Sequence, residues 1–237
     1  MLGAVSQSGN TPTMYNPIAC YDASDTSASN ITESVGSLSL IKDRSGNGID
    51  ATQVSGSVQP DTNSSTIGGL NAISFASGDY LDMGTIATSG NLTVICAFKP
   101  TSNLSGFASF FSGDSTDNDF QIDAGTSASY MGRFNSTNLG VTGTANLVTN
   151  QQNTSIVTSY RLSSFAGNIV IRLNGALVDT DTYNGSLATS LIMRIAANRA
   201  VNTGIAMKMG EFLIFDEALS DAQMLTIETY LMNKWGI

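Results

Sequence analysis

The chain has 237 residues, of which 41% are hydrophobic and only 12% are charged, and its formal net charge is −9. With 10 Lys and Arg residues against 19 Asp and Glu residues, it has little positive charge to neutralise phosphates, so we expect no binding to nucleic acid or to a membrane surface. It has no apolar run of about 18 residues, the length that a membrane-spanning helix needs.

The first residues differ in character from the rest of the chain. Met1–Asn16 shows no hydrophobic periodicity and is rich in Ser, Thr, Asn and Gly, so we predict an N-terminal arm over residues 1–16 and a folded domain over residues 17–237. The start also lacks the basic and apolar regions of a signal peptide. We therefore expect synthesis in a host cytoplasm without a signal peptide.

From residue 38 onward, short apolar runs alternate with Gly, Asn, Asp and Ser clusters, which is the pattern of an all-β sandwich. In chain order the predicted strands are Leu38–Ile41, Asp50–Val54, Ala72–Phe75, Tyr80–Met83, Leu92–Phe98, Phe107–Phe111, Asp119–Ile122, Tyr130–Phe134, Thr154–Leu162, Asn168–Leu173, Ala176–Asp179, Leu191–Ala196 and Met207–Phe215. The tract Thr137–Asn153 is polar and is expected to hold strand edges and loops.

Two of these segments carry further information. Asn174 and Gly175 separate two apolar runs, and this pair favours a type I′ turn because both positions need positive φ. The run Leu92–Phe98 is apolar on both faces, whereas a sandwich strand normally needs one apolar face. We expect the second face to be covered by a helix, by the N-terminal arm or by another subunit.

The chain closes with a predicted amphipathic helix. Ser220 and Gln223 form a capping box at its start. Beyond them, hydrophobic residues recur at three- or four-residue steps and form one apolar stripe: Met224, Ile227, Leu231 and Trp235.

Three motifs together resemble the LamG-like, concanavalin A-like lectin and glucanase family. They are Tyr21–Asp25 followed by Asp43–Gln53, then Gly69–Phe75 with Gly78–Leu81, and finally the closing segment Gly210–Ile237. The resemblance implies a concanavalin A-like jelly-roll β-sandwich of two antiparallel sheets with one C-terminal helix. It implies less about function, because this sandwich hosts lectins, enzymes and structural modules.

Enzymatic chemistry has few candidates here. The chain has no histidine, which removes the commonest general base. Glu211 and Asp216 are the nearest match to the acids of related glucanases, but five residues separate them, so a regular strand would point them to opposite faces. We therefore predict no catalytic residues, with Glu211 exposed on a strand and Asp216 in a turn. The two cysteines, Cys20 and Cys96, are expected to be free thiols.

Binding chemistry has two weak candidates. Asp114, Asp117 and Asp119 alternate with polar residues, so they are possible Ca²⁺ ligands, or they belong to a solvated loop. No other cofactor is expected.

For a sugar, Tyr183, Asn184 and Tyr130 are the candidate residues, because an aromatic ring beside an amide suits a saccharide face. Trp235 is assigned to the core. The motif Asp43–Gly48 is interpreted as structural, with its glycines in left-handed conformations.

The resemblance and the polar surface lead to a main functional expectation and two alternatives. The first is a non-enzymatic structural protein on the exterior of a bacteriophage virion, attached to other virion proteins through its N-terminal arm and assembled as a homo-oligomer, with a trimer as one possibility. The second is a carbohydrate-binding adhesin or host-recognition protein that binds surface glycans. A glycoside hydrolase is the third, and it is disfavoured by the acid spacing.

Overall fold

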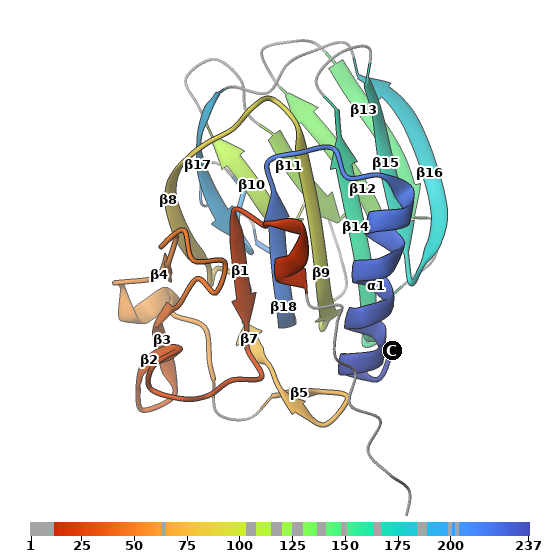
Figure 1. Cartoon of the computed structure of the whole chain (residues 1–237). Coiled ribbons are helices and arrows are strands. Elements are labelled where there is room, and N and C mark those ends of the chain that lie inside the picture. Colours follow the sequence, from red (N-terminus) through yellow and green to blue (C-terminus); the bar gives the residue numbers. More distant parts are fainter. Residues whose placement is uncertain are drawn as a thin grey trace, which may run out of the picture.

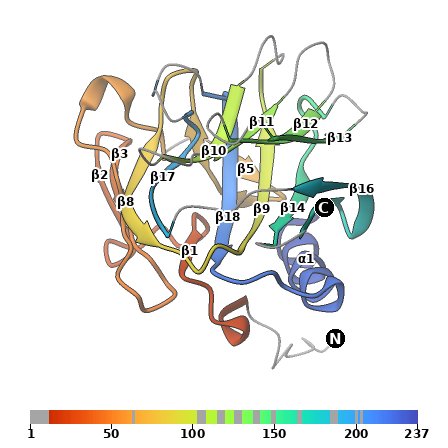
Figure 2. The ribbon, with the colours of Figure 1, turned by 90° about the horizontal axis from the view of Figure 1, so that it is seen from above.

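The structure of the chain is a computed structural model. It describes residues 12–62, 65–102, 108–114, 120–124, 130–136, 141–147, 151–163, 167–183, 189–198, 201 and 204–237. Two antiparallel sheets stack face to face, and a C-terminal helix covers the outer side of one of them (Figures 1 and 2). The predicted all-β sandwich with two antiparallel sheets and a terminal helix is confirmed.

The first sheet has β18 and β9 at its centre. Its strands, in spatial order, are β1 (Ala19–Asp22), β18 (Met207–Phe215), β9 (Leu92–Pro100), β14 (Ile156–Leu162), β15 (Gly167–Leu173) and β16 (Ala176–Tyr183). The short strand β7 (Ile73–Phe75) also pairs with β18. The predicted hairpin between β15 and β16 is confirmed, with φ of 46° at Asn174 and 82° at Gly175.

The second sheet lies over the first and runs on to the β2–β3 hairpin. Its strands, in spatial order, are β13 (Val141–Leu147), β12 (Tyr130–Ser136), β11 (Phe120–Ala124), β10 (Ala108–Asp114), β17 (Ser190–Ile195), β8 (Leu81–Ala87), β4 (Ala51–Thr52), β3 (Ser37–Ile41) and β2 (Ile31–Ser34). Separate from both sheets are the pair β5 (Thr66–Ile67) and β6 (Leu70–Asn71) and the 3-10 helices η1 (Pro12–Tyr15) and η2 (Gly56–Val58).

Sequence reasoning missed several short elements. The strands β1, β2, β5 and β6 were not predicted, since each has at most four residues and too few positions for a period to appear. The tract expected to hold strand edges and loops contains the full strand β13. The end of the predicted arm is not a free tail, because Tyr15 packs against the cluster under the helix.

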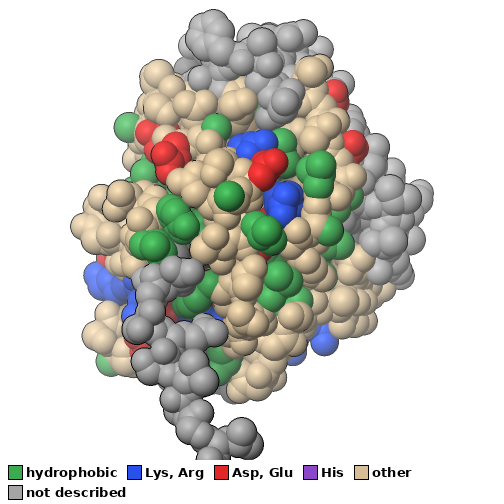
Figure 3. All heavy atoms as spheres, turned by 45° about the vertical axis from the view of Figure 1, so that its right-hand side comes forward, with side chains coloured by type: hydrophobic (Ala, Val, Ile, Leu, Met, Phe, Trp, Pro, Cys, Tyr) green, Lys and Arg blue, Asp and Glu red, His purple; other side chains and the backbone are tan. Residues whose placement is uncertain are grey.

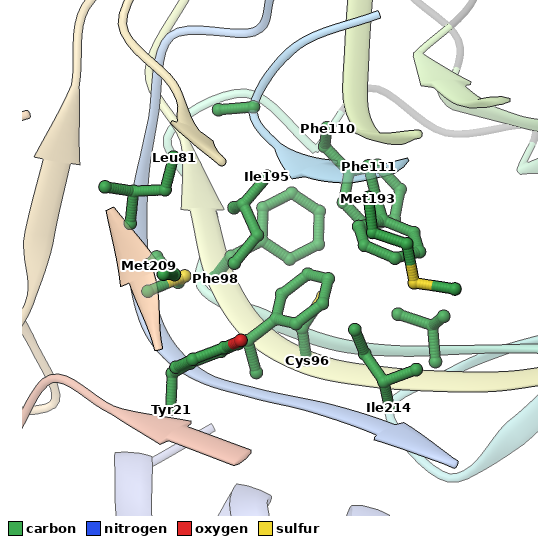
Figure 4. Close-up of a cluster of buried hydrophobic side chains, with 14 of the residues drawn as sticks. Tyr21, Leu81, Cys96, Phe98, Phe110, Phe111, Met193, Ile195, Met209 and Ile214 are labelled. Carbon is green, nitrogen blue, oxygen red and sulfur yellow. The ribbon is translucent and has the colours of Figure 1, made fainter. Parts of the chain in front are cut away.

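The main core fills the space between the two sheets, as Figure 4 shows. Aromatic rings interlock across it: the Phe98 and Phe110 rings stack with centroids 5.4 Å apart, and the Phe111 and Phe212 rings tilt at 5.2 Å. Each of these side chains is at most 1% exposed, which stabilises the fold by about 2 to 3 kcal/mol per ring. Tyr160, also 1% exposed, joins this core and is unavailable as a surface aromatic.

A second core lies between the first sheet and α1 (Asp221–Trp235). The predicted stripe of Met224, Ile227, Leu231 and Trp235 is fully buried against the outward side chains of β9 and β18. The helix therefore supplies the cover that the two-faced run in β9 required. The predicted capping box of Ser220 and Gln223 at the start of the helix is formed.

Exposed hydrophobic side chains on the face over α1 are scattered among polar groups (Figure 3). Leu225 on the helix is 44% exposed, and Leu177 on β16 is 57% exposed. Isolated exposed hydrophobic residues are ordinary on protein surfaces. Of the helices in the described part of the chain, none has the length and apolar character to span a bilayer.

Candidate functional site

The motifs singled out in the sequence meet at the C-terminal end of α1. Asp22 on β1 pairs in register with Glu211 on β18. The Lys234 Nζ of the helix lies 2.7 Å from Asp22 Oδ2 and 2.6 Å from Glu211 Oε2. Trp235 Nε1 donates to the same Glu211 oxygen at 3.4 Å. The opening and closing motifs therefore form one polar cluster that joins the first strand, the last strand and the helix.

Two glycines make room for this cluster. The register between β18 and β9 shifts between Met209 and Glu211, at Gly210. A Cβ added to Gly210 would lie 2.9 Å from ring atoms of Trp235. At Gly68, φ is +57° and a Cβ would lie 1.9 Å from the Trp235 carbonyl oxygen. Both positions need glycine so that backbone and helix end can approach closely.

The electrostatics of this cluster indicate a structural role. Burial raises the pKa of Glu211, Lys234 opposes that rise, and Asp22 adds to it. Burial alone would lower the pKa of Lys234, but Glu211 and Asp22 raise it above its ordinary value. The expectation that Glu211 is exposed is wrong, because the residue is only 2% exposed. The end of the helix covers Glu211, and the Lys234 and Trp235 side chains donate hydrogen bonds to its carboxylate.

The second acid of the glucanase-like run faces other partners. Asp216, after the end of β18, accepts from the Ser89 backbone N–H at 2.5 Å. Glu211 is bound instead to the helix. The two carboxylates are therefore engaged in different places, and they do not form the open pair that a retaining glycosidase presents to its substrate.

The loop motif from Asp43 to Gly48 also holds the fold together. Asp43 Oδ1 accepts from the Cys20 N–H at 3.0 Å, and Asp43 Oδ2 accepts from the Ile49 N–H at 3.1 Å. Gly46 and Gly48 have φ of 94° and 75°, in the predicted left-handed conformation. One side chain thus ties the loop to β1, as the structural interpretation of this motif expects.

A polar pocket of about 580 Å³ opens beside the β2–β3 hairpin, and that hairpin lies at the lower left of Figure 1. Its volume lies within the range of small-molecule sites. Three separate segments line it: the loop before β2, the strand β2 itself, and the β5–β6 region from Thr62 to Asn71. The lining residues are Thr26, Ala28, Ile31, Thr32, Glu33, Thr62 and Asn71.

Most of the lining groups are hydroxyl, amide or carboxylate. Thr62 Oγ1 donates to Glu33 Oε2 and also contacts the Gly36 carbonyl at 3.2 Å. Asn71 Nδ2 donates to the Ala23 carbonyl at 2.8 Å, which joins β6 to the loop after β1. These internal bonds hold polar side chains in place around the opening, which is how a preorganised binding site is built.

Sequence reasoning did not find this pocket. Its lining residues span positions 26 to 71 and share no motif, although Asn71 belongs to one of the family-like segments. Only the pairing of β2 with β3 and the placement of β6 beside them bring the three segments together. Polar residues on a short edge hairpin give no periodic signal, so the sequence pattern could not have indicated the pocket.

The predicted sugar-binding residues lie at two ends of the sandwich. Tyr183 ends β16 at the end where β9 begins, which is uppermost in Figure 1, and Tyr130 begins β12 at the opposite end. For both residues the structure describes the strand position only. Asn184 lies outside the described residues. The register therefore separates Tyr130 from Tyr183, and sugar binding by either residue stays a prediction.

The predicted calcium site is also untested. Asp114 is the last residue of β10, while Asp117 and Asp119 lie outside the described residues. Within the described ranges, no group of three or more Cys, Asp and Glu side chains is arranged to hold a metal ion. That search did not cover the acidic loop, so calcium binding there stays a prediction.

Comparisons with known proteins show what the sandwich resembles. No protein-family model matches the chain, and no curated protein matches it either. Solved structures do match. The receptor-binding domain of botulinum neurotoxin D has a TM-score of 0.67 at 13% identity, and the match covers 94% of this chain and 54% of that one. This chain therefore spans about half of the toxin binding domain.

Two sugar-binding structures match over almost their whole length. Domain 4 of AbnA, an extracellular arabinanase from Geobacillus stearothermophilus, solved with arabinotriose, has a TM-score of 0.62 at 13% identity and is covered to 98%. The CBM40 domain of the Ruminococcus gnavus IT-sialidase, solved with α2,3-sialyllactose, has a TM-score of 0.52 at 11% identity and is covered to 96%. At these identities the likeness shows the fold alone, a sandwich of two antiparallel sheets, and assigns no role to this chain.

Proposed function

We propose that this chain is a non-catalytic carbohydrate-binding domain that recognises a glycan through the pocket beside the β2–β3 hairpin. The observation that carries the proposal is the pocket itself, a cavity of about 580 Å³ lined by hydroxyl, amide and carboxylate side chains. Such groups exchange hydrogen bonds with sugar hydroxyls. The neighbouring structures with arabinotriose and sialyllactose support the choice of a saccharide.

The acids in the chain support a binding role over catalysis. Glu211, the first acid of the glucanase-like run, is buried and bound to Lys234. The pocket has a single carboxylate, from Glu33, among its lining residues. Hydrolysis with retention or inversion needs two acids across the scissile bond. We therefore expect the purified chain to bind oligosaccharides without shortening them.

A pocket-blocking substitution tests this proposal. Ala28 lines the pocket, so Ala28→Phe should fill it and abolish binding in a glycan array and in calorimetric titrations of the array hits. Ala222 is exposed on the first turn of α1, so Ala222→Phe is a matched control that should bind like the wild type. Equal binding by both variants would show that the glycan sits elsewhere, for example near Tyr183 at the end of β16.

The exterior of a bacteriophage particle is one setting in which such a domain would act. The virion location, attachment through residues 1–16 and a homo-oligomer such as a trimer rest on the sequence alone and stay predictions. Deletion of residues 1–16 tests them: the sandwich should still fold, while attachment to virion proteins should be lost. Mass measurement of the intact protein reports the oligomeric state.

A further inference from the structure

The pocket beside the β2–β3 hairpin has a one-sided charge. Glu33 is exposed on β2 and is the one charged residue among the lining side chains, the others being threonine, alanine, isoleucine and asparagine. A ligand in the pocket therefore lies close to a carboxylate. No lysine or arginine lines the opening to offset that charge.

The cations on neighbouring segments are already engaged. Arg44 Nη1 lies 2.8 Å from Asp25 Oδ2, next to the pocket-lining loop. Lys42 Nζ lies 2.6 Å from Asp50 Oδ2. Both cations are thus compensated by aspartates. The whole chain, at a net charge of −9, adds a negative background field.

We infer that the pocket selects saccharides without acidic groups, meaning neutral sugars and amino sugars, and excludes sialylated, uronic and sulfated ones. This inference rests on the proposed function. An acidic sugar would place a second negative charge about 6 Å from Glu33 at a partly exposed site. The repulsion there lies between the value in water and the value at a protein surface, and it should weaken binding by about tenfold. An amino sugar gains a favourable contact with the same carboxylate.

Matched ligand pairs test the inference on the full chain. Lactose and α2,3-sialyllactose differ by one acidic sugar, and oligogalactose and oligogalacturonate differ by a carboxylate on each residue. The neutral member of each pair should bind about tenfold more tightly at low ionic strength. The preference should shrink as salt is raised from about 0.01 M to about 0.15 M, because the Debye length falls from about 30 Å to about 8 Å.

A charge-removing substitution gives a second readout. Glu33→Gln keeps an acceptor for Thr62 and removes the charge, so it should reduce the neutral-over-acidic ratio severalfold. Glu217 is exposed after the end of β18, and Glu217→Gln is the matched control that should leave the ratio unchanged. If Glu33→Gln does not fold, the salt series on the wild type still decides the question.

The outcomes separate this inference from the proposed function. Both the charge selection and the binding function are supported if Glu33→Gln loses the preference for neutral sugars and Ala28→Phe abolishes binding. Equal or tighter binding of acidic glycans, still abolished by Ala28→Phe, overturns the charge selection and leaves the binding function standing. Failure to bind any member of either pair, or any array glycan, overturns both.

Discussion

Substitution of Arg172 on β15 by Met should strongly destabilise the fold, because its guanidinium is one partner of a buried ion pair. Arg172 Nε donates to both carboxylate oxygens of Glu228 on α1, at 2.9 and 3.1 Å. Glu228 is 0% exposed and Arg172 is 7% exposed. Ser159 Oγ donates to the same carboxylate at 2.6 Å. Together with Ser159, the pair therefore joins the helix to β14 and β15 at a site shielded from bulk solvent.

Removal of the guanidinium leaves the buried Glu228 carboxylate with a serine hydroxyl as its remaining donor. Loss of one partner of a buried ion pair typically costs about 3 to 5 kcal/mol, because the remaining charge is desolvated and uncompensated. Replacement of both partners by apolar residues of similar size is much less costly, since neither charge is then buried. We expect Arg172→Met to cost about 3 to 5 kcal/mol and Arg172→Met with Glu228→Leu to cost about 1 kcal/mol or less.

Urea unfolding of the wild type, both single variants and the double variant measures this. The double-mutant cycle should give a coupling energy above about 2 kcal/mol. A loss below about 1 kcal/mol for Arg172→Met, or strictly additive single effects, would refute the reasoning, because the pair would then behave like a solvent-screened surface ion pair.

Two further predictions concern the packing of α1 on Gly210 and the two buried thiols. Gly210→Ala should lower the free energy of unfolding in urea by about 1 to 3 kcal/mol, because its Cβ would lie 2.9 Å from the Trp235 ring. Gly56→Ala is the control and should be near neutral, since the nearest atom to its Cβ would be 3.9 Å away. Equal effects of the two substitutions would contradict the packing argument. Burial raises the pKa of Cys20 and Cys96 from 9.0 to about 12. Between these two pH values the thiols are protonated in the folded chain and lose their protons on unfolding. Stability should therefore fall as pH rises above 9.0, by about 1 kcal/mol per pH unit for each thiol. Thermal unfolding across this range checks the slope, which should be smaller in Cys96→Ala; an unchanged slope would contradict it.

Local signals in the sequence were sufficient for the terminal helix and the β15–β16 hairpin. The stripe from Met224 to Trp235 predicted the terminal helix, and the Asn174–Gly175 pair predicted its hairpin, because both depend on residues close together in the chain. The two-faced run in β9 indicated that another element covers the sheet. The fold class followed from these patterns together with the family-like motifs.

Long-range pairing decided what these same patterns left open. Glu211 was expected to be exposed on its strand, as charged side chains usually are. The register shift at Gly210 and the contact with Lys234 of the C-terminal helix accompany its burial instead. Glu228 lies beside the apolar stripe of α1, and only the position of Arg172 on another strand explains its burial.

The sequence by itself thus determined an all-β domain with a terminal helix, since hydrophobic periodicity and turn chemistry are local properties, and the resemblance of its motifs implied the two-sheet sandwich. The tertiary structure decided the rest: the family-like motifs became a buried structural cluster, and a pocket formed between segments that span residues 26 to 71. Such sites depend on which chain segments become neighbours, and that is set by strand register and packing rather than by any single stretch of residues.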